Sequence, residues 1–189
     1  MIRKTEYENH LHEQEARWFA IYTNYKREKQ TLKFLQQKGV EAYLPIQKLT
    51  RRYVRKVKHI ELPLINCYLF VKITKSEYIR VLETENVLKF IKFSNNLIAI
   101  PEAEIQLMKR IIGEEVDFTF EPSTFVEGEM VEVIGGQLTG LEGKLISKEG
   151  KQQFLIELTS IGYNFQMTID PALLRIKKGV SRQTTILAD

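Results

Sequence analysis

The sequence of 189 residues has very little cysteine and histidine and no long apolar run. Its one cysteine, Cys67, excludes an internal disulfide and is typical of a reducing compartment. The three histidines, His10, His12 and His59, are scattered and show no zinc-binding spacing. The most apolar stretch, residues 60–73, is interrupted by charged residues and is too short to span a membrane. With no apolar core of a signal peptide in the first twenty residues, we expect a cytoplasmic protein without a metal or a membrane partner.

Motifs of catalysis are also missing from the sequence. No serine or cysteine nucleophile has a nearby histidine signature, and no carboxylate pair stands out. Gly135-Gly136 is not followed by the start of a helix with Lys-Ser/Thr, so it does not match a phosphate-binding loop. Cys67 lies in an apolar run, where an inert buried thiol is the expected interpretation. We therefore expect no enzymatic activity and no cofactor.

Charge is distributed unevenly along the chain. The net charge is +4, but residues 1–113 carry 21 Lys/Arg against 12 Asp/Glu, a balance of +9. Residues 114–189 carry 7 Lys/Arg against 12 Asp/Glu, a balance of −5. Such an asymmetry favours two domains, of which the basic one faces a polyanion and the acidic one has another task.

The first half of the chain alternates strand-like and helix-like segments. Residues 1–15 are polar and are predicted to form a mobile tail. The predicted strands are 16–24, 40–44, a long central strand 62–73, 87–93 and a basic hairpin over 46–59. The predicted helices are 25–38 ended by Gly39, 76–82 with Ser76 as N-cap, and 101–112 with a buried stripe of Ile105, Met108 and Ile112. This order predicts that residues 16–113 form an α+β sandwich with a mainly antiparallel sheet.

The second half reads as short strands separated by glycine turns. Residues 114–124 are acidic, contain a proline and show no clear period, so we predict a linker there. Residues 125–178 are predicted to form a small β-barrel, in which Gly135-Gly136 permits a tight turn. Residues 179–189 are a predicted C-terminal tail. An ordinary all-β hairpin domain explains the glycine spacing equally well.

Basic residues gather at two places in the first half. They are Lys26 and Arg27 at the start of the first predicted helix, and Arg51, Arg52, Arg55 and Lys56 in the hairpin. Such residues can lie along a nucleic-acid backbone without reading its bases. A solvated charged surface is the alternative interpretation, and it remains open at this point.

Three motifs together resemble one family. The pattern V-x-V-x-x-G-x-x-x-G-x-x-G over residues 131–143, preceded by Phe125-x-x-Gly128, resembles the KOW motif that opens small SH3-like barrels. Trp18-Phe19-Ala20-Ile21 resembles the W-Y-V-V opening strand of the NusG family of bacterial transcription elongation factors. Residues 63–71, PLINCYLFV, resemble its F-P-G-Y-V-x-V strand. With an acidic linker between two such domains, residues 16–178 are similar to NusG proteins of the NGN-plus-KOW type.

Departures from the family pattern indicate a specialised paralogue. Asn66 and Cys67 stand where the family has Pro-Gly, and Gln137 stands where the KOW motif has proline. Together with the short linker and the basic hairpin, these departures resemble the UpxY and RfaH-type antiterminators, which act on long operons.

The resemblance implies a binding function in transcription elongation or antitermination. In the family, the N-terminal domain packs an apolar surface on the β′ clamp helices of RNA polymerase, bridges toward the β gate loop and suppresses pausing and termination. The residues that match this surface are Phe19, Tyr22, Ile65, Tyr68 and Phe70. Core packing is the alternative for each, and strand alternation cannot place all five on one face.

The resemblance also implies further partners. The basic residues Lys26, Arg27, Arg51, Arg52, Arg55 and Lys56 would meet upstream or non-template DNA. The KOW domain would recruit ribosomal protein S10 or Rho through a loop that contains Ile161, Gly162, Tyr163 and Asn164. We expect a monomer. A ribosome- or RNA-associated KOW protein with no role at the polymerase is the second hypothesis, because the first half is basic and KOW motifs occur in ribosomal proteins.

Overall fold

The computed structural model describes residues 7–53, 56–93, 95–113, 116–122, 128–148 and 151–177. Within these ranges, the side chains of residues 50–53, 56, 58, 148 and 151 are not described. The chain divides into two compact units between residues 115 and 116, and each is considered by itself. In the described ranges, none of the helices combines the length and the apolar character that crossing a membrane requires.

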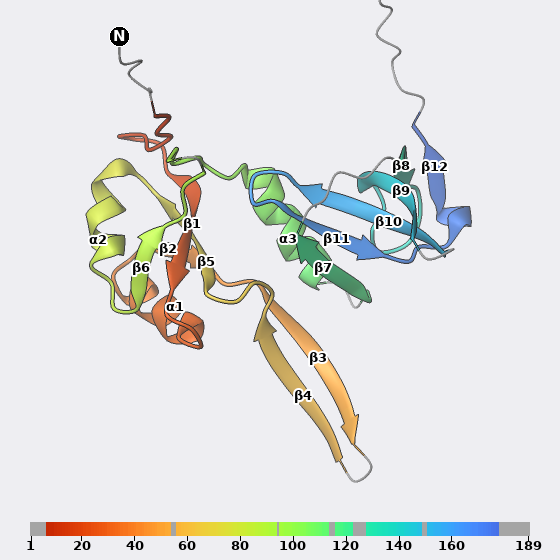
Figure 1. Cartoon of the computed structure of the whole chain (residues 1–189), viewed down its shortest axis with the longest axis horizontal. Helices are drawn as coiled ribbons and strands as arrows, with labels where there is room; N and C mark the ends of the chain where they lie inside the picture. Colours follow the sequence, from red (N-terminus) through yellow and green to blue (C-terminus); the bar gives the residue numbers. More distant parts are fainter. Residues whose placement is uncertain are drawn as a thin grey trace, which may run out of the picture. The chain divides into compact units, whose positions relative to one another are not determined.

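The N-terminal unit is built on a four-stranded antiparallel sheet with the order β2-β5-β1-β6 (Figure 1). Its strands are β1 (Arg17–Thr23), β2 (Glu41–Tyr43), β5 (Tyr68–Ile73) and β6 (Val87–Phe90). The two most apolar strands, β1 and β5, lie at the centre, with Tyr22 opposite Tyr68 and Ala20 opposite Phe70. Apolar side chains on both faces of β1 and β5 predict this central position, because helices must cover both faces.

Helices contact both faces of this sheet. The core on one face contains Phe19 and Ile21 of β1 with Leu35 of α1 (Glu28–Gln37) and Val81 of α2 (Tyr78–Leu82). On the other face, the indole Nε1 of Trp18 donates a hydrogen bond of 2.8 Å to Glu102 of α3 (Glu102–Gly113). The mixed α and β class with antiparallel sheets is therefore confirmed.

The hairpin β3 (Ile46–Tyr53) and β4 (Lys56–Pro63) forms a separate two-stranded sheet that projects from the N-terminal unit (Figure 1). The predicted central strand over residues 62–73 is wrong, because the chain turns between β4 and β5. Cys67 has a φ of 65° in this turn, a left-handed conformation that a strand does not contain. A nearly continuous apolar run hides the break, because only Asn66 among the turn residues 64–67 is polar.

The predicted mobile tail is wrong for residues 7–15. The backbone N–H of His10 donates to the carbonyl of Leu97 at 2.9 Å, and the N–H of Leu97 donates to the carbonyl of Glu8 at 2.9 Å. The side chain of Leu11 packs against the core of the N-terminal unit. This one apolar anchor and the backbone pairing hold the segment, and residues 1–6 lie outside the described part of the chain.

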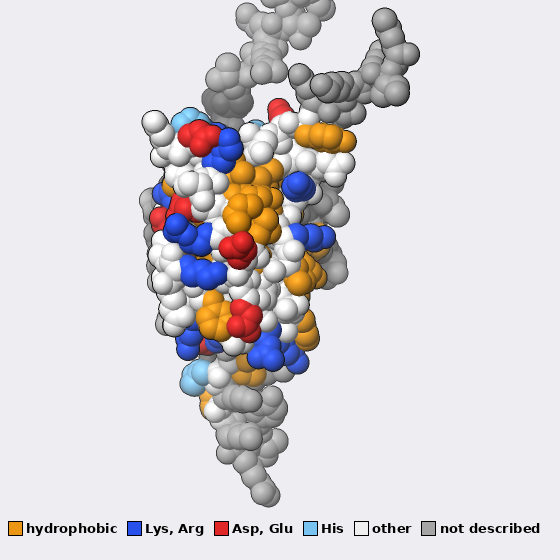
Figure 2. Space-filling model, turned by 90° about the vertical axis from the view of Figure 1, so that its left-hand side faces the viewer, with side chains coloured by type: hydrophobic (Ala, Val, Ile, Leu, Met, Phe, Trp, Pro, Cys, Tyr) orange, Lys and Arg blue, Asp and Glu red, His pale blue; other side chains and the backbone are white. Residues whose placement is uncertain are grey.

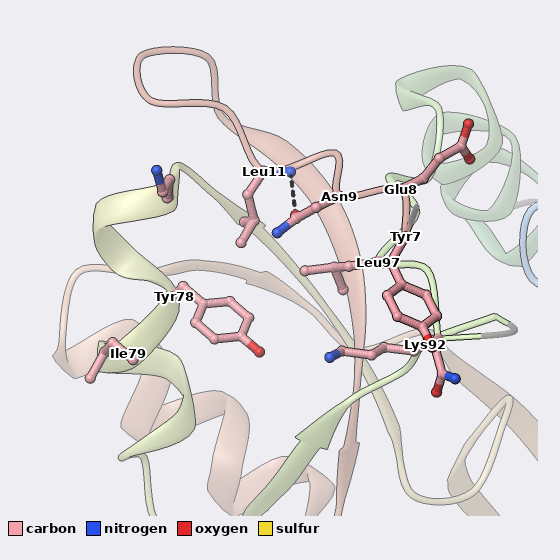
Figure 3. A pocket seen from close by; sticks show the side chains of 10 residues that line it. Tyr7, Glu8, Asn9, Leu11, Tyr78, Ile79, Lys92 and Leu97 are labelled. Atoms are coloured by element: carbon pink, nitrogen blue, oxygen red, sulfur yellow. Dashed lines mark hydrogen bonds between the residues drawn. The ribbon is translucent and has the colours of Figure 1, made fainter. Parts of the chain in front are cut away.

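The N-terminal segment forms one wall of a pocket of about 770 Å³ (Figure 3). Figure 3 shows Tyr78 of α2 and Lys92 pointing toward each other in this pocket, with Leu11 and Leu97 above them in this view. Asn9 accepts a hydrogen bond from the N–H of Leu11 at 3.0 Å. Residues 7–11 are therefore part of the folded domain and do not form a tail.

The helical segment after β5 begins at Lys75, one residue before the predicted start. A 3-10 turn, η1 (Lys75–Glu77), precedes α2, and Thr74 is its N-cap instead of Ser76. Thr74 and Glu77 form a reciprocal capping box, which satisfies two backbone donors at once. Two other details also differ, since α3 buries Ile111 rather than Ile112, and Tyr25 lies outside α1 and is exposed.

The C-terminal unit is a six-stranded antiparallel sheet with the order β12-β8-β9-β10-β11-β7. Its strands are β7 (Phe118–Pro122), β8 (Glu129–Val133), β9 (Glu142–Lys148), β10 (Lys151–Leu158), β11 (Tyr163–Met167) and, after the 3-10 turn η2 (Pro171–Leu173), β12 (Leu174–Ile176). Gly136 has a φ of 79° in the turn between β8 and β9, as the predicted Gly135-Gly136 turn requires, whereas Gly135 does not adopt a positive φ. Gly140 also has a positive φ, of 83°. The opening residues of that motif, 125–127, and the predicted C-terminal tail lie outside the described residues.

The predicted linker, residues 114–124, contributes a strand to this sheet. β7 (Phe118–Pro122) pairs along β11 with Phe120 opposite Phe165. The alternation Phe118-Thr119-Phe120 is too short to indicate a strand by itself. Its partner lies about 45 residues later in the chain, so local sequence reasoning does not find the pairing.

Candidate protein- and nucleic-acid-binding surfaces

Two tyrosines form a cross-strand pair on one face of the N-terminal sheet. Tyr22 of β1 and Tyr68 of β5 lie opposite each other, with ring centroids 5.9 Å apart and planes at 87°. Both side chains are half-buried, so part of each ring remains accessible. Edge-to-face packing of this kind holds both rings in fixed orientations. The structure therefore brings together two of the five residues predicted for polymerase binding as an accessible aromatic pair.

The other three predicted residues are buried. Phe70 lies on the same sheet face as the tyrosine pair, but it is fully buried and stacks on Tyr43 with centroids 6.4 Å apart. Phe19 lies on the opposite face, within the core that α1 and α2 cover. Ile65 is 6% exposed and lies in the turn between β4 and β5. Phe19 is thus a core residue, because strand alternation separates it from Tyr22.

Lysines surround the aromatic side chains of this face. The Nζ of Lys89 lies 5.8 Å from the ring centroid of Tyr22. The Nζ of Lys109, on α3, lies 5.4 Å from the ring of Trp18 and 5.2 Å from that of Tyr43. Cations at these distances are attracted to the ring faces and give the aromatic surface a positive border.

A buried glutamate fixes the turn that precedes Tyr68. Glu28, in the first turn of α1, is 4% exposed and accepts a hydrogen bond of 2.9 Å from the backbone N–H of Cys67. The backbone N–H of Thr23 donates to the carbonyl of Cys67 at 2.8 Å. A hydrogen bond with Cys67 raises the pKa of the Tyr22 hydroxyl above its ordinary value. Glu28 was not among the predicted site residues, although an acidic residue at the start of a basic helix is a recognisable signal in the sequence.

A second carboxylate joins α3 to the sheet. Glu102 accepts hydrogen bonds from Gln106 at 2.7 Å and from Trp18 at 2.8 Å, and it pairs with Lys72 at 3.0 Å. The hydrogen bonds from Gln106, Lys72 and Trp18 lower the pKa of Glu102 to about 2. The carboxylate is therefore ionised at neutral pH and ties the helix to the face that carries the tyrosine pair.

The predicted nucleic-acid contacts lie at the start of α1 and in the β3–β4 hairpin. Lys26 is exposed and has a φ of 61°, and Arg27 is exposed and donates to Gln30 at 3.2 Å. Arg55 lies outside the described residues. Arg51, Arg52 and Lys56 belong to the hairpin strands, but their side chains are not described. DNA contact by this set stays a prediction.

The side of the N-terminal unit that carries α2 also combines apolar and basic groups. Figure 2 shows hydrophobic side chains flanked by Lys and Arg side chains on this side. Exposed hydrophobic residues of the unit include Tyr7, Ile79, Leu88 and Phe93. A surface with both characters suits a macromolecular partner better than a small polar ligand.

The predicted partner loop of the C-terminal unit is only partly accessible. Ile161 is 6% exposed and Asn164 is 1% exposed, so both are core residues. Gly162 is exposed with a φ of 69° and forms the turn between β10 and β11. Tyr163 is half-buried, and its ring stacks on Phe120 of β7 with centroids 4.9 Å apart. Of the four residues, only Gly162 and Tyr163 offer contact surface.

The N-terminal unit is thus an α/β domain with an aromatic sheet face bordered by lysines. Such a face fits the binding surface of a domain that contacts another macromolecule. Residues 16–109 match the family model described as transcription termination factor nusG. The chain carries a NusG domain and belongs to the NusG family of transcription factors. The family assignment rests on this match.

Two solved structures are also similar to the chain. The chain is similar to NusG of Thermotoga maritima with 17% identity and a TM-score of 0.49, over 86% of this chain and 98% of that chain. It is also similar to a chain of the MjSpt4:Spt5 complex in conformation A, with 15% identity and a TM-score of 0.30, over 85% of this chain and 98% of that chain. No curated protein matches the sequence.

Proposed function

We propose that this protein is a transcription elongation or antitermination factor that binds the β′ clamp helices of RNA polymerase through its N-terminal unit. The observation that carries the proposal is the half-buried Tyr22–Tyr68 pair on an open part of the NusG-domain sheet. Aromatic anchors of this kind dominate the binding energy of protein interfaces. Binding there would hold the clamp closed, reach toward the β gate loop, and suppress pausing and termination.

The border of lysines specifies the chemistry of the partner. Lys89 lies against Tyr22, and an incoming surface would meet its ammonium group beside the ring. An amphipathic helix with an apolar stripe and flanking carboxylates fits such a surface. Fixed ring orientations reduce the side-chain entropy lost on binding, since the two tyrosines already pack against each other.

The remaining basic and acidic surfaces supply the further contacts of the proposal. Lys26, Arg27 and the hairpin residues Arg51, Arg52, Arg55 and Lys56 would contact upstream or non-template DNA through its backbone. The C-terminal unit would be a KOW domain that recruits a protein such as ribosomal protein S10 or Rho. Its acidic balance of −5 over residues 114–189 suits a basic protein partner better than RNA.

The specialised character of the factor also belongs to the proposal. Cys67 occupies the position of a family glycine and keeps the left-handed backbone conformation that glycine would adopt. A residue with a side chain in this place packs against the binding face, which suits an operon-specific paralogue of the UpxY or RfaH type. The protein would act as a monomer in the cytoplasm.

Retention of purified RNA polymerase on the immobilised full-length chain tests the proposal. We expect retention that a β′ clamp-helix fragment competes away and that Tyr68→Ala weakens at least about tenfold, because a central aromatic anchor is lost. Tyr25→Ala is the matched control, since Tyr25 is exposed and lies outside the tyrosine pair.

Two outcomes would contradict the proposal. Polymerase retention that does not respond to Tyr68→Ala in a folded variant would place the interface elsewhere. No retention, together with tight and salt-sensitive binding to bulk RNA, would favour a ribosome- or RNA-associated protein instead.

A further inference from the structure

β7 is the last strand of the C-terminal sheet and pairs with β11 alone among the described strands. The outer edge of an unpaired β11 would present a row of backbone donors and acceptors, which is a template for an added strand. In this structure, the chain fills that edge with five of its own residues, Phe118–Pro122. β10, which has eight residues, is paired on both sides by strands of the sheet.

The side chains of β7 cover the aromatic residues of β11. Phe120 stacks on Tyr163 with centroids 4.9 Å apart and planes at 5°, and it lies 4.7 Å from the ring of Phe165. Phe118 meets Phe165 edge to face at 5.1 Å. Tyr163 is also the aromatic residue of the predicted partner loop. β7 therefore partly covers Tyr163, one of the two accessible residues that the resemblance assigns to a partner.

β7 is attached through side chains that remain partly exposed. Both of its phenylalanines are half-buried, Thr119 is exposed, and Pro122 ends the strand without a backbone donor. On the other face, Gln166 donates a hydrogen bond of 3.2 Å to Glu121. Strands with few buried contacts open at lower free energy than the core of their sheet.

We propose that the outer edge of β11 is a strand-accepting site for an extended segment of a protein partner, and that β7 fills this site in the free protein. The segment carries bulky apolar side chains at alternate positions, which replace Phe118 and Phe120 against Phe165 and Tyr163. Basic residues flank these positions, because residues 114–189 carry a balance of −5. The inference rests on the proposed partner-recruiting role of the C-terminal unit.

Hydrogen exchange of the full-length chain and binding of a peptide test this inference together. In the wild type, we expect amides of β7 to exchange at least about tenfold faster than amides of β8 to β10, because the edge strand opens without the rest of the sheet. The probe is a labelled, end-capped peptide with the sequence of residues 116–122, VDFTFEP, followed by fluorescence anisotropy. We expect it to bind the double variant Phe118→Ser and Phe120→Ser, whose own β7 is weakened, and not the wild type.

Matched controls make each outcome informative. Met130→Ser changes an exposed apolar residue on β8, and this variant should not bind the peptide. A peptide in which serine replaces both phenylalanines should bind no variant. Equal protection of β7 and β10 in the wild type would show that β7 is an integral strand, and the inference would be wrong. The same conclusion follows if the double variant loses protection throughout β8 to β11, or if it stays folded and does not bind the peptide.

This experiment contains no polymerase, and its readouts come from the C-terminal unit alone. Failure of peptide binding with intact polymerase retention would overturn the strand-accepting site and leave the proposed function in place. Loss of polymerase retention with normal peptide binding would overturn the proposed polymerase binding and leave the strand-accepting site in place.

Discussion

Replacing Glu28 by alanine should destabilise the N-terminal unit more than its position on a polar helix suggests. The carboxylate is 4% exposed and accepts the backbone N–H of Cys67 at 2.9 Å. Leaving a buried donor without its charged acceptor costs about 1.5–3 kcal/mol. Loss of a negative charge in the first turn of α1 adds about 0.3–1 kcal/mol through the helix dipole. We therefore expect the free energy of unfolding to fall by about 2–4 kcal/mol in Glu28→Ala.

Urea unfolding followed by tryptophan fluorescence measures this loss for the N-terminal unit specifically. Trp18 is the only tryptophan in the chain and lies on β1, so its emission reports that unit. Glu28→Gln keeps an amide oxygen where the acceptor oxygen lies, and we expect it to lose only about 1 kcal/mol, the typical worth of a neutral hydrogen bond. Lys29→Ala removes a neighbouring exposed ion pair with Glu61 and should cost less than about 1 kcal/mol.

The comparison between the two Glu28 variants decides whether the reasoning holds. A loss in Glu28→Ala that is no larger than the loss in Glu28→Gln would show that the Cys67 N–H does not depend on this carboxylate. A change in the denaturant slope would mean that the variants differ in the structure of the native or unfolded state, so the slopes must agree before the free energies are compared.

Three further predictions concern other parts of the molecule. Tyr68→Ala should keep the free energy of unfolding in urea within about 1 kcal/mol of the wild type while polymerase retention falls, and a collapsed unfolding transition would instead make Tyr68 a core residue. Because Glu102 has a folded-state pKa of about 2 against an ordinary value of 4.5, its stabilising contribution is present above pH 4.5 and is lost as the pH falls toward 2. Its side chain is 48% exposed, so solvent screening reduces that contribution to about 1 kcal/mol. In urea titrations between pH 5 and pH 2, Glu102→Gln should therefore remove this part of the pH dependence of the free energy of unfolding. Gly143→Ala should destabilise the C-terminal unit by about 1–3 kcal/mol in thermal unfolding followed by circular dichroism, because an added Cβ meets the Leu155 carbonyl and lies 2.8 Å from the Phe154 ring; an unchanged midpoint would show that β10 shifts freely.

The sequence predicted those parts of the fold that local patterns specify. Apolar and aromatic residues identified β1 and the two longer helices, and Gly39 ends α1 with a φ of 75° as a C-terminal glycine does. Alternation in residues 154–158 and 163–167 identified β10 and β11. These signals repeat over several residues, so a single unusual position does not hide them.

The errors arose where long-range contacts decide the structure. The N-terminal segment looks like a tail because its backbone hydrogen bonds reach Leu97, about 90 residues later. β7 looks like a linker because its stabilising rings come from Tyr163 and Phe165. Strand alternation in the sequence showed that the five candidate polymerase-binding residues do not all lie on one sheet face. Which of them share a face depends on the register of β1 against β5, and the sequence does not determine that register.

The Cys67 turn contacts the sheet face that carries the Tyr22–Tyr68 pair. A left-handed conformation costs a residue with a side chain about 1–2 kcal/mol relative to glycine. Hydrogen bonds from the Cys67 N–H to Glu28 and from Thr23 to the Cys67 carbonyl offset that cost. The Cys67 side chain in turn contacts the Tyr22 hydroxyl, whose pKa it raises. A glycine would form the same turn with less strain, but it would leave Tyr22 without this contact, and so the cysteine couples the turn before β5 to the orientation of the Tyr22–Tyr68 pair.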